Sequence, residues 1–234
     1  TRYIHTRDSF KATMQAEIIT IGDELLIGQV VDTNSAWLGR TLGEDGIKVT
    51  QITSVQDDAD QIARAVNEAL ARVSIVLVTG GLGPTRDDIT KHTLAELFGM
   101  RLVRDEQVYE TVRRQLAVRG IAFNELNRGQ ALVPDGCTVL PNRNGTAPGM
   151  WFERGRKILV SMPGVPFEMK ALVTDEVLPR LRTHFSLHAN VHRTAITFGL
   201  AESILAERIA PWEAALPANL RLAWTEQKYE LGIA

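Results

Sequence analysis

The chain has 234 residues, of which 44% are hydrophobic, enough to bury the core of one ordinary globular domain or of one domain with a small annex. Lys and Arg number 26 against 28 Asp and Glu, so the formal net charge of −2 gives no sign of a nucleic-acid or membrane surface. The single cysteine, Cys137, excludes an internal disulfide and disfavours a zinc site built from cysteines. The sequence has no run of about 18 apolar residues and no signal-peptide core, so we expect a cytoplasmic protein that binds neither nucleic acid nor membranes.

The first 13 residues differ from the sequence that follows. Residues 1–13 show no apolar periodicity, and Met14 stands just ahead of a clear strand pattern. We therefore interpret residues 1–13 as an extension that lies ahead of the fold.

The following segments alternate between strand and helix patterns. Buried apolar runs predict strands, and amphipathic periodicity predicts helices, in the order 16–22, 33–46, 47–55, 58–72 and 73–80. Asp32 or Thr33 is a candidate cap of the first helix, and Gly46 is its candidate stop. Short connections between strands that are apolar on both faces predict a parallel sheet with helices on both sides.

The rest of the chain continues as α/β and then changes character. Helices are predicted at 88–99 and 105–120, strands at 130–134 and 137–141, a hairpin around Gly155, and a helix at 166–185 with an interruption near Thr174. Residues 186–234 offer another strand, a helix broken by Pro211, and a last strand. The fold class is therefore α/β, a three-layer parallel or mixed sheet with helices on both faces over residues 14–185, followed by a small α+β appendage over 186–234.

Acidic or glycine-rich loops follow the first three predicted strands. They read TIGDELLIG, SVQDDAD and TGGLGPTRDDIT. Each alone is explained by turns and helix caps, but ligands of open parallel sheets bind at this edge, and three such loops together favour a site. Gly80, Gly81 and Gly83 can turn their N–H groups toward a phosphate, near the N-terminus of the next helix. The loop matches neither GxGxxG nor GxxxxGK[ST], so a Walker-type site is not predicted.

Two adjacent aspartates in the third loop predict a cation. Asp87 and Asp88 would repel a bare phosphate unless a divalent metal lay between carboxylate and phosphate oxygens, as Mg²⁺ does. Asp57, after the second strand, is the natural further carboxylate, whereas Asp58 is interpreted as a first-turn helix residue. Asp87 has an equal claim to be a helix cap.

Two later loops also have anion-binding character. NRNGTAPG at 142–149 combines asparagine, threonine and two glycines, and SMPGVPFEM at 161–169 leads from a strand into a helix. The histidines at 184, 188 and 192 are interpreted as solvated rather than as metal ligands, and Cys137 as a turn residue rather than a nucleophile.

Four ordered motifs resemble one known family. IGDELLIGQVVDTNSAWL, TGGLGPTRDDIT, NGTAPGM and MPGVPFEM are similar to the N-terminal domain of the competence-damage-inducible protein CinA family, which has the molybdopterin-binding fold of molybdenum-cofactor biosynthesis proteins. The resemblance implies that Asp57 and Asp88 are catalytic and that Asp57, Asp87 and Asp88 hold a divalent metal such as Mg²⁺, Mn²⁺ or Co²⁺. Together with the loops described above, it gives the expected substrate-binding residues: Gly22, Asp23, Glu24, Asp32, Asn34, Thr79, Gly80, Gly81, Gly83, Thr90, Asn144, Gly145, Thr146, Gly149, Pro163 and Gly164.

The resemblance implies three alternative functions. The first is metal-dependent hydrolysis of ADP-ribose to AMP and ribose 5-phosphate, with the N–H groups of 80–83 and 145–146 holding the non-reacting phosphate. The second is a molybdopterin-binding module or an adenylyltransferase-like protein, with molybdopterin as its ligand. The third is a non-catalytic regulatory protein. By analogy with relatives of this fold, we also expect a homo-oligomer.

Residues 190–234 resemble the start of the KH-like module of the same family, through TFGLAESILAERI and WEAALP. The segment lacks the GXXG loop of RNA-binding KH domains, so the resemblance does not imply an RNA ligand. The deamidase domain of longer members has no counterpart in this sequence, and that activity is not expected here.

Overall fold

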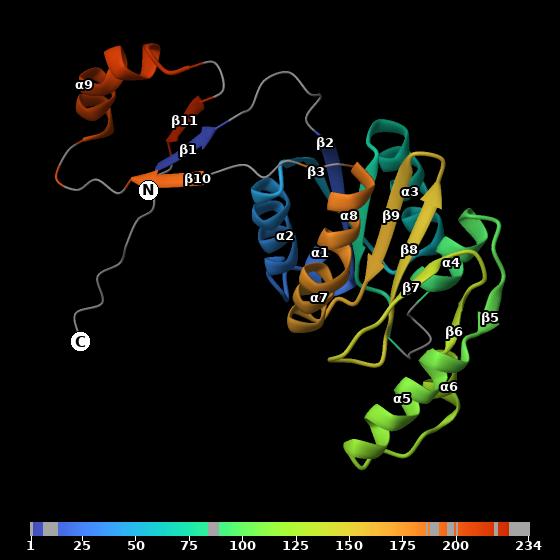
Figure 1. Cartoon of the computed structure of the whole chain (residues 1–234). Helices are drawn as coiled ribbons and strands as arrows, with labels where there is room; N and C mark the ends of the chain where they lie inside the picture. Colours follow the sequence, from blue (N-terminus) through green and yellow to red (C-terminus); the bar gives the residue numbers. More distant parts are fainter. Residues whose placement is uncertain are drawn as a thin grey trace, which may run out of the picture.

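A six-stranded sheet forms the centre of the protein (Figure 1). The computed structural model describes residues 2–6, 14–83, 89–185, 187, 192–195, 199, 201–217 and 220–224. In spatial order the strands are β3 (Ile47–Val55), β2 (Met14–Ile21), β4 (Ile75–Thr79), β9 (Lys157–Met162), β8 (Gly149–Arg154) and β7 (Thr138–Leu140). The first four are mutually parallel, and β8 and β7 add antiparallel. The predicted mixed sheet is confirmed.

Helices cover both faces of this sheet. One face carries α2 (Thr33–Glu44), α7 (Pro166–Leu172) and α8 (Leu178–Phe185), and the other carries α3 (Ala59–Arg72) and α4 (Thr90–Leu97). Successive residues of β2 pack against the helices on opposite faces of the sheet. Ile18 packs with Leu38 of α2, and its neighbour Ile19 packs with Ile62 of α3. The three-layer α/β architecture expected from the sequence is therefore confirmed.

The predicted helix ends and the predicted hairpin are found close to their expected places. Asp32 caps α2 by accepting a hydrogen bond from the Ser35 N–H at 2.9 Å. Asp58 caps α3 through the Gln61 N–H at 2.9 Å, so it precedes the helix and does not lie in its first turn. The interruption near Thr174 is a π-helical turn (Val173–Val177) between α7 and α8. The turn around Gly155 joins the antiparallel β8 and β9.

A smaller lobe is inserted between α4 and β7. It consists of β5 (Leu102–Arg104), α5 (Glu106–Val118), α6 (Glu125–Gly129) and β6 (Leu132–Pro134). β5 and β6 pair antiparallel, and the buried side chains of α5 pack with Val133 in a separate cluster. β5, α6 and the one-turn helix α1 (Asp23–Leu26) were not predicted, because each carries at most two apolar residues, too few to show a period.

The chain termini contribute to a second, three-stranded sheet. Its order is β10 (His192–Ala195), β1 (Arg2–Thr6) and β11 (Leu220–Trp224), with both pairs antiparallel. Residues 2–6 are therefore the central strand of a sheet, which corrects their interpretation as an extension ahead of the fold. Its two apolar residues, Tyr3 and Ile4, are adjacent and so give no alternating pattern, and its partners lie far along the sequence.

Helix α9 (Glu202–Ala214) of the same region runs through Pro211 without a break. The predicted break is wrong: Pro211 lies inside the helix at an exposed position, where water can replace the hydrogen bond that its missing N–H would have made. The predicted KH-like identity of residues 186–234 stays a prediction, and residues 225–234 lie outside the described part. Among the described residues, no helix is both long and apolar enough to cross a membrane.

Candidate ligand-binding cleft

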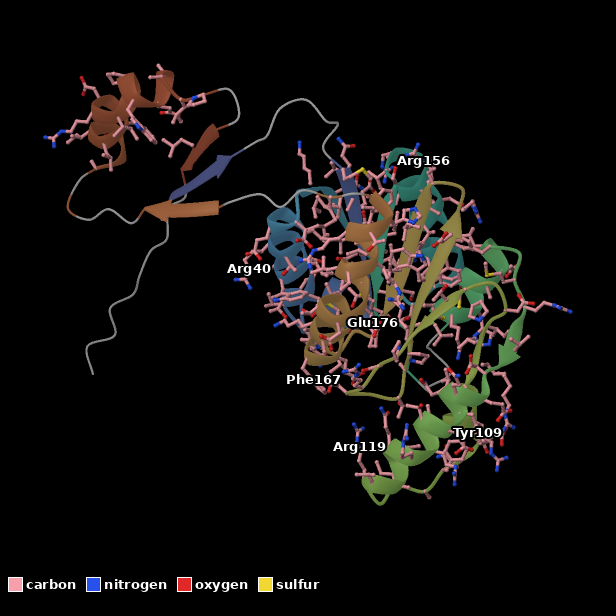
Figure 2. All side chains as sticks on the ribbon, in the orientation of Figure 1. Arg40, Tyr109, Arg119, Arg156, Phe167 and Glu176 are labelled. Carbon is pink, nitrogen blue, oxygen red and sulfur yellow. The ribbon has the colours of Figure 1, made fainter. Side chains whose placement is uncertain are left out.

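The loops that follow β2, β4 and β9 meet at the carboxyl edge of the parallel strands. The Gly80 N–H donates to the Met162 carbonyl at 3.1 Å, and a Cβ on Gly164 would lie 3.4 Å from the Gly80 Cα. Gly80 has φ +112°, and any side chain there would overlap the Ile21 carbonyl oxygen. The three loops are therefore in contact, and Gly80 is needed for that contact. In Figure 2, Phe167, just after the β9 loop, lies toward the opposite end of the six-stranded sheet from Arg156 of the β8–β9 turn.

A cavity opens between the β2 loop, α2 and the β9 loop. Its polar lining is Thr20, Glu24, Asp32, Thr33, Asn34 and Thr79, and its apolar lining includes Leu25, Val30, Val31 and Pro166. The Asn34 amide donates to the Gly164 carbonyl at 2.7 Å and lies 3.5 Å from the Thr79 hydroxyl. Asn34 Oδ1 is buried and has no hydrogen-bond partner among the described residues. The cavity therefore contains an acceptor in need of a donor.

A second group of polar residues lies two residues beyond Thr79 and consists of Gly81, Thr90 and Asp57, which we call the Gly81 cluster. A Cβ on Gly81, whose φ is +63°, would overlap Thr90 Oγ1 and lie 2.8 Å from Asp57 Oδ1. Thr90 is the first residue of α4 and is completely buried, yet its hydroxyl has no partner among the described residues. No side chain caps α4 among those described. Gly81, Thr90 and Asp57 therefore converge on one point at the start of a helix.

Further backbone donors lie beside Gly81. Within the described part of the chain, no backbone carbonyl accepts from the N–H groups of Gly81, Leu82 or Gly83. Such N–H groups, together with an uncapped helix N-terminus, form an environment that favours an anion. The Gly80 N–H does not contribute, since it donates to Met162.

Most of the predicted substrate-binding residues are brought together at this edge. Those that line the cavity, belong to the Gly81 cluster or hold these loops in place are Gly22, Glu24, Asp32, Asn34, Thr79, Gly80, Gly81, Thr90, Pro163 and Gly164. Asp23 and Gly83 are exposed beside them. Asp87 and Asp88 lie outside the described residues, so their predicted catalytic and metal-binding roles stay predictions.

In the loop 142–147, the N–H groups are not arranged as the sequence predicted. The N–H groups of Asn144 and Gly145 both donate to Asn142 Oδ1 at 3.0 Å, so the prediction that the Gly145 N–H holds a phosphate is wrong in this structure. Gly145 and Thr146 line a different cavity, of ≈ 180 Å³, against Val108 and Thr111 of α5. Gly149 is buried, and a Cβ there would lie 2.5 Å from the Leu172 side chain, which makes it a packing residue.

The residues that the sequence analysis missed form the apolar wall of the cavity. Val30 is half exposed and Val31 is mostly exposed although both are hydrophobic, and both line the cavity beside Leu25. Exposed apolar side chains that gather at a cavity are typical of ligand sites. The signal in the sequence is the pair Val30-Val31 in a loop directly before the Asp32 cap, which fits neither a strand nor a helix face.

Only part of the predicted metal site lies among the described residues. The described residues contain no group of three or more His, Cys, Asp and Glu side chains that could hold a metal ion. Of the predicted ligands, Asp57 alone is described, beside Gly81. Because Mg²⁺ commonly binds through one or two carboxylates together with substrate phosphates, Asp57 at an anion pocket fits such an ion.

Cys137 is half-buried, in surroundings that disfavour its thiolate form. Burial raises the pKa of its thiol to about 11, above an ordinary value of 9.0, so the neutral thiol is the form present at pH 8. We expect alkylation by iodoacetamide at pH 8 to be about 100-fold slower in the native protein than in guanidinium, since the thiolate fraction falls tenfold per pKa unit. Mass spectrometry of timed samples measures both rates. Equal rates would show that the thiol is exposed and its pKa ordinary.

The same pKa shift affects stability at high pH. Because the pKa of this thiol is higher in the folded than in the unfolded protein, its contribution to stability is complete below pH 9 and is lost as the pH rises toward 11.

Comparisons with known proteins agree with this architecture. Residues 17–183 match the family described as "Probable molybdopterin binding domain". A CinA-like protein of Cytophaga hutchinsonii is 49% identical over 209 residues, which are 89% of this chain and 50% of that protein. The crystal structure of the protein CinA from Thermoplasma acidophilum has a TM-score of 0.64 and 36% identity, covering 69% of this chain and 95% of that one.

A more distant structure supports the fold alone. A molybdopterin biosynthesis protein from Mycobacterium abscessus has a TM-score of 0.51 and 19% identity, covering 75% of this chain and 96% of that one. The chain spans about half the length of the curated relatives it matches. The resemblance to CinA read from the four motifs is confirmed, and the family match covers most of the chain. The chain therefore belongs to the family of probable molybdopterin-binding domains and has CinA-like proteins among its relatives.

Proposed function

We propose that this chain binds a phosphorylated pterin of the molybdopterin type in the cleft at the carboxyl edge of the sheet. The observation that carries the proposal is the Thr90 hydroxyl, which is completely buried without a partner among the described residues and lies beside Gly81 at the uncapped start of α4. A buried hydroxyl without a hydrogen bond is costly, so its retention favours a ligand that completes it. The family match supports a molybdopterin-type ligand.

The phosphate fits the Gly81 cluster. The N–H groups of Gly81, Leu82 and Gly83, the first turn of α4 and the Thr90 hydroxyl are donors that a phosphate oxygen can accept from. The Asp57 carboxylate beside them would repel the phosphate, so the proposal includes a divalent cation between the two. Gly81 has no side chain, so the phosphate can approach the backbone closely.

The pterin ring fits the neighbouring cavity. A 2-amino-4-oxo pterin presents N–H donors at one edge and two flat apolar faces. Asn34 Oδ1 and the Glu24 carboxylate offer acceptors, while Val30 and Val31 offer an apolar wall. Thr79 lines this cavity and lies two residues before Gly81, so one ligand can span both parts.

Replacing Thr90 with valine tests the proposal. The methyl group keeps the shape of the side chain but cannot donate, so we expect molybdopterin, released anaerobically from a molybdoenzyme, to bind about 10-fold more weakly. Because the hydroxyl has no partner among the described residues without ligand, the unfolding midpoint should stay level or rise. Ultrafiltration, with fluorescence of the oxidised pterin as readout, measures the affinity.

Thr93→Val is the matched control on the same helix. The Thr93 hydroxyl donates to the Ile89 carbonyl at 3.1 Å, within the helix, so its loss should leave affinity unchanged. Equal affinity of wild type and Thr90→Val would contradict the placement of the phosphate, and no retention of molybdopterin by wild type would contradict the function.

Metal-dependent hydrolysis of ADP-ribose is a second candidate, favoured by the Asp57 carboxylate beside Gly81. Water would add to one phosphorus while the bridging P–O bond breaks, giving AMP and ribose 5-phosphate. A divalent cation would supply charge neutralisation and a bound water of lowered pKa, held by Asp57 and the predicted ligands Asp87 and Asp88. Incubation with ADP-ribose and Mg²⁺, Mn²⁺ or Co²⁺ tests this candidate, and AMP no higher than in the enzyme-free control with all three metals would remove it.

A further inference from the structure

Loop 142–147 is held in one shape by a single side chain, that of Asn142. Its Oδ1 accepts from the Asn144 and Gly145 N–H groups, and its Nδ2 donates to the Ala147 carbonyl at 2.9 Å. The same Nδ2 donates to Glu168 Oε2 at 2.7 Å. All four hydrogen-bonding positions of this buried amide are therefore used, and only one of them leaves the loop.

Glu168 receives that bond in the first turn of α7. Gly145 is packed so closely on the Glu168 carboxylate that any Cβ there would overlap Glu168 Oε2. From the other side, α5 fixes the loop through Gln115 Nε2, 3.1 Å from the Asn142 carbonyl, and Arg119 Nη2, 2.9 Å from the Asn144 carbonyl. Loop 142–147 is therefore a rigid support against which Glu168 rests.

The residues just before Glu168 form part of the cleft wall. Pro166 and Gly164 line the cavity, and Gly164 is also the acceptor of the Asn34 amide. The start of α7 is thus held by Asn34 on the cleft side and by Asn142 through Glu168 on the far side. Neither Asn142 nor Glu168 lines the cavity around Asn34.

We infer that Asn142 and Glu168 are positioning residues for the cleft: their hydrogen bond fixes the first turn of α7, and with it Gly164, Pro166 and the orientation of the Asn34 amide. The inference rests on the proposed function for its effect on ligand affinity. Its structural half, the fixing of residues 163–168 by loop 142–147, is independent of any ligand.

Asn142→Asp is the variant that breaks the pair. The introduced aspartate keeps an oxygen acceptor for the Asn144 and Gly145 N–H groups but places a carboxylate against the Glu168 carboxylate, and like charges at this distance repel. We expect the affinity for molybdopterin to fall about 10-fold, within the usual range of coupling between separate sites. In the ligand-free protein, amide hydrogen exchange of the peptide 161–172 should become faster.

Asn142→Asp combined with Glu168→Gln restores the bond to residue 168 with its direction reversed, since the amide of the introduced glutamine donates to the carboxylate of the introduced aspartate. The bond from residue 142 to the Ala147 carbonyl is lost in both variants, so the difference between them reports the contact with residue 168 alone. We expect the double variant to recover most of the affinity and of the exchange protection that Asn142→Asp loses, a recovery that additive damage does not produce. Glu168→Gln alone keeps an acceptor for Asn142 and should change little.

Glu176→Gln is the matched control. It removes the carboxylate of Glu176 from the helical run that follows α7 (Figure 2), and it should alter neither readout. Glu176 pairs with Arg180 at 3.2 Å. Wild-type exchange of the peptide 161–172 in Asn142→Asp, or a folded double variant that recovers neither property, would overturn the inference. If wild type binds no molybdopterin, the proposed function fails, and the exchange data still decide whether the pair fixes α7.

Discussion

Gly81→Ala is expected to weaken molybdopterin binding by about 100-fold or more. The new methyl group would overlap the Thr90 hydroxyl and lie 2.8 Å from Asp57 Oδ1, in the space assigned to the phosphate. The backbone φ of +63° adds strain of about 1 kcal/mol for any residue with a Cβ. Retention of molybdopterin by ultrafiltration measures the affinity, and thermal unfolding measures the accompanying loss of stability.

Gly155→Ala is the control that distinguishes backbone strain from steric obstruction of the phosphate position. Gly155, in the β8–β9 turn, has the same φ of +63°, but a Cβ there meets nothing within 4 Å. This control should lose stability through backbone strain and keep wild-type affinity. If Gly81→Ala loses no more affinity than Gly155→Ala, the phosphate does not lie at Gly81.

Phe152→Ala is expected to destabilise the fold by about 4 kcal/mol, as large truncations in closed cores do. Phe152 is completely buried in β8, and its ring lies 4.8 Å from that of Phe98 between centroids. The surrounding residues cannot close the cavity that the truncation leaves, because β8 is fixed by β7 and β9 on both sides. Urea unfolding followed by circular dichroism gives the free energy of unfolding.

Phe167→Ala is the matched control, because it makes the same substitution at an exposed position. Phe167 is 60% exposed at the start of α7, so the same truncation should cost no more than about 0.5 kcal/mol (Figure 2). Similar losses in the two variants would mean that Phe152 does not lie in a closed core.

The strands and main helices were predictable because their signals are local. Buried parallel strands are apolar on both faces, and Asp32 and Asp58 mark helix starts whose side chains bond within three residues. β1 was not predictable, since its five residues acquire a role only when distant strands pair with them on both sides. The continuity of α9 through Pro211 depends on solvent exposure, which the sequence does not specify.

The site was predictable in position but not in every contact. Glycines and polar residues after successive strands placed the cleft at the correct edge, because parallel topology brings strand ends together. The motif NGT suggested free N–H donors, but Asn142, outside that motif, accepts from the N–H groups of Asn144 and Gly145. The hydrogen bond between Asn142 and Glu168 spans 26 residues, and nothing in either local sequence indicates it.

The central claim is that the cleft holds a pterin whose phosphate lies on the loop after β4. The most direct test compares the affinity for molybdopterin with the affinity for its dephosphorylated form. We expect wild-type protein to bind molybdopterin and to bind the dephosphorylated pterin at least about 10-fold more weakly, because several charge-assisted hydrogen bonds are lost. In Gly81→Ala this difference should vanish, since the obstruction removes the phosphate's own contacts. Equal affinity of wild type for the two forms, or binding of neither, would contradict the account.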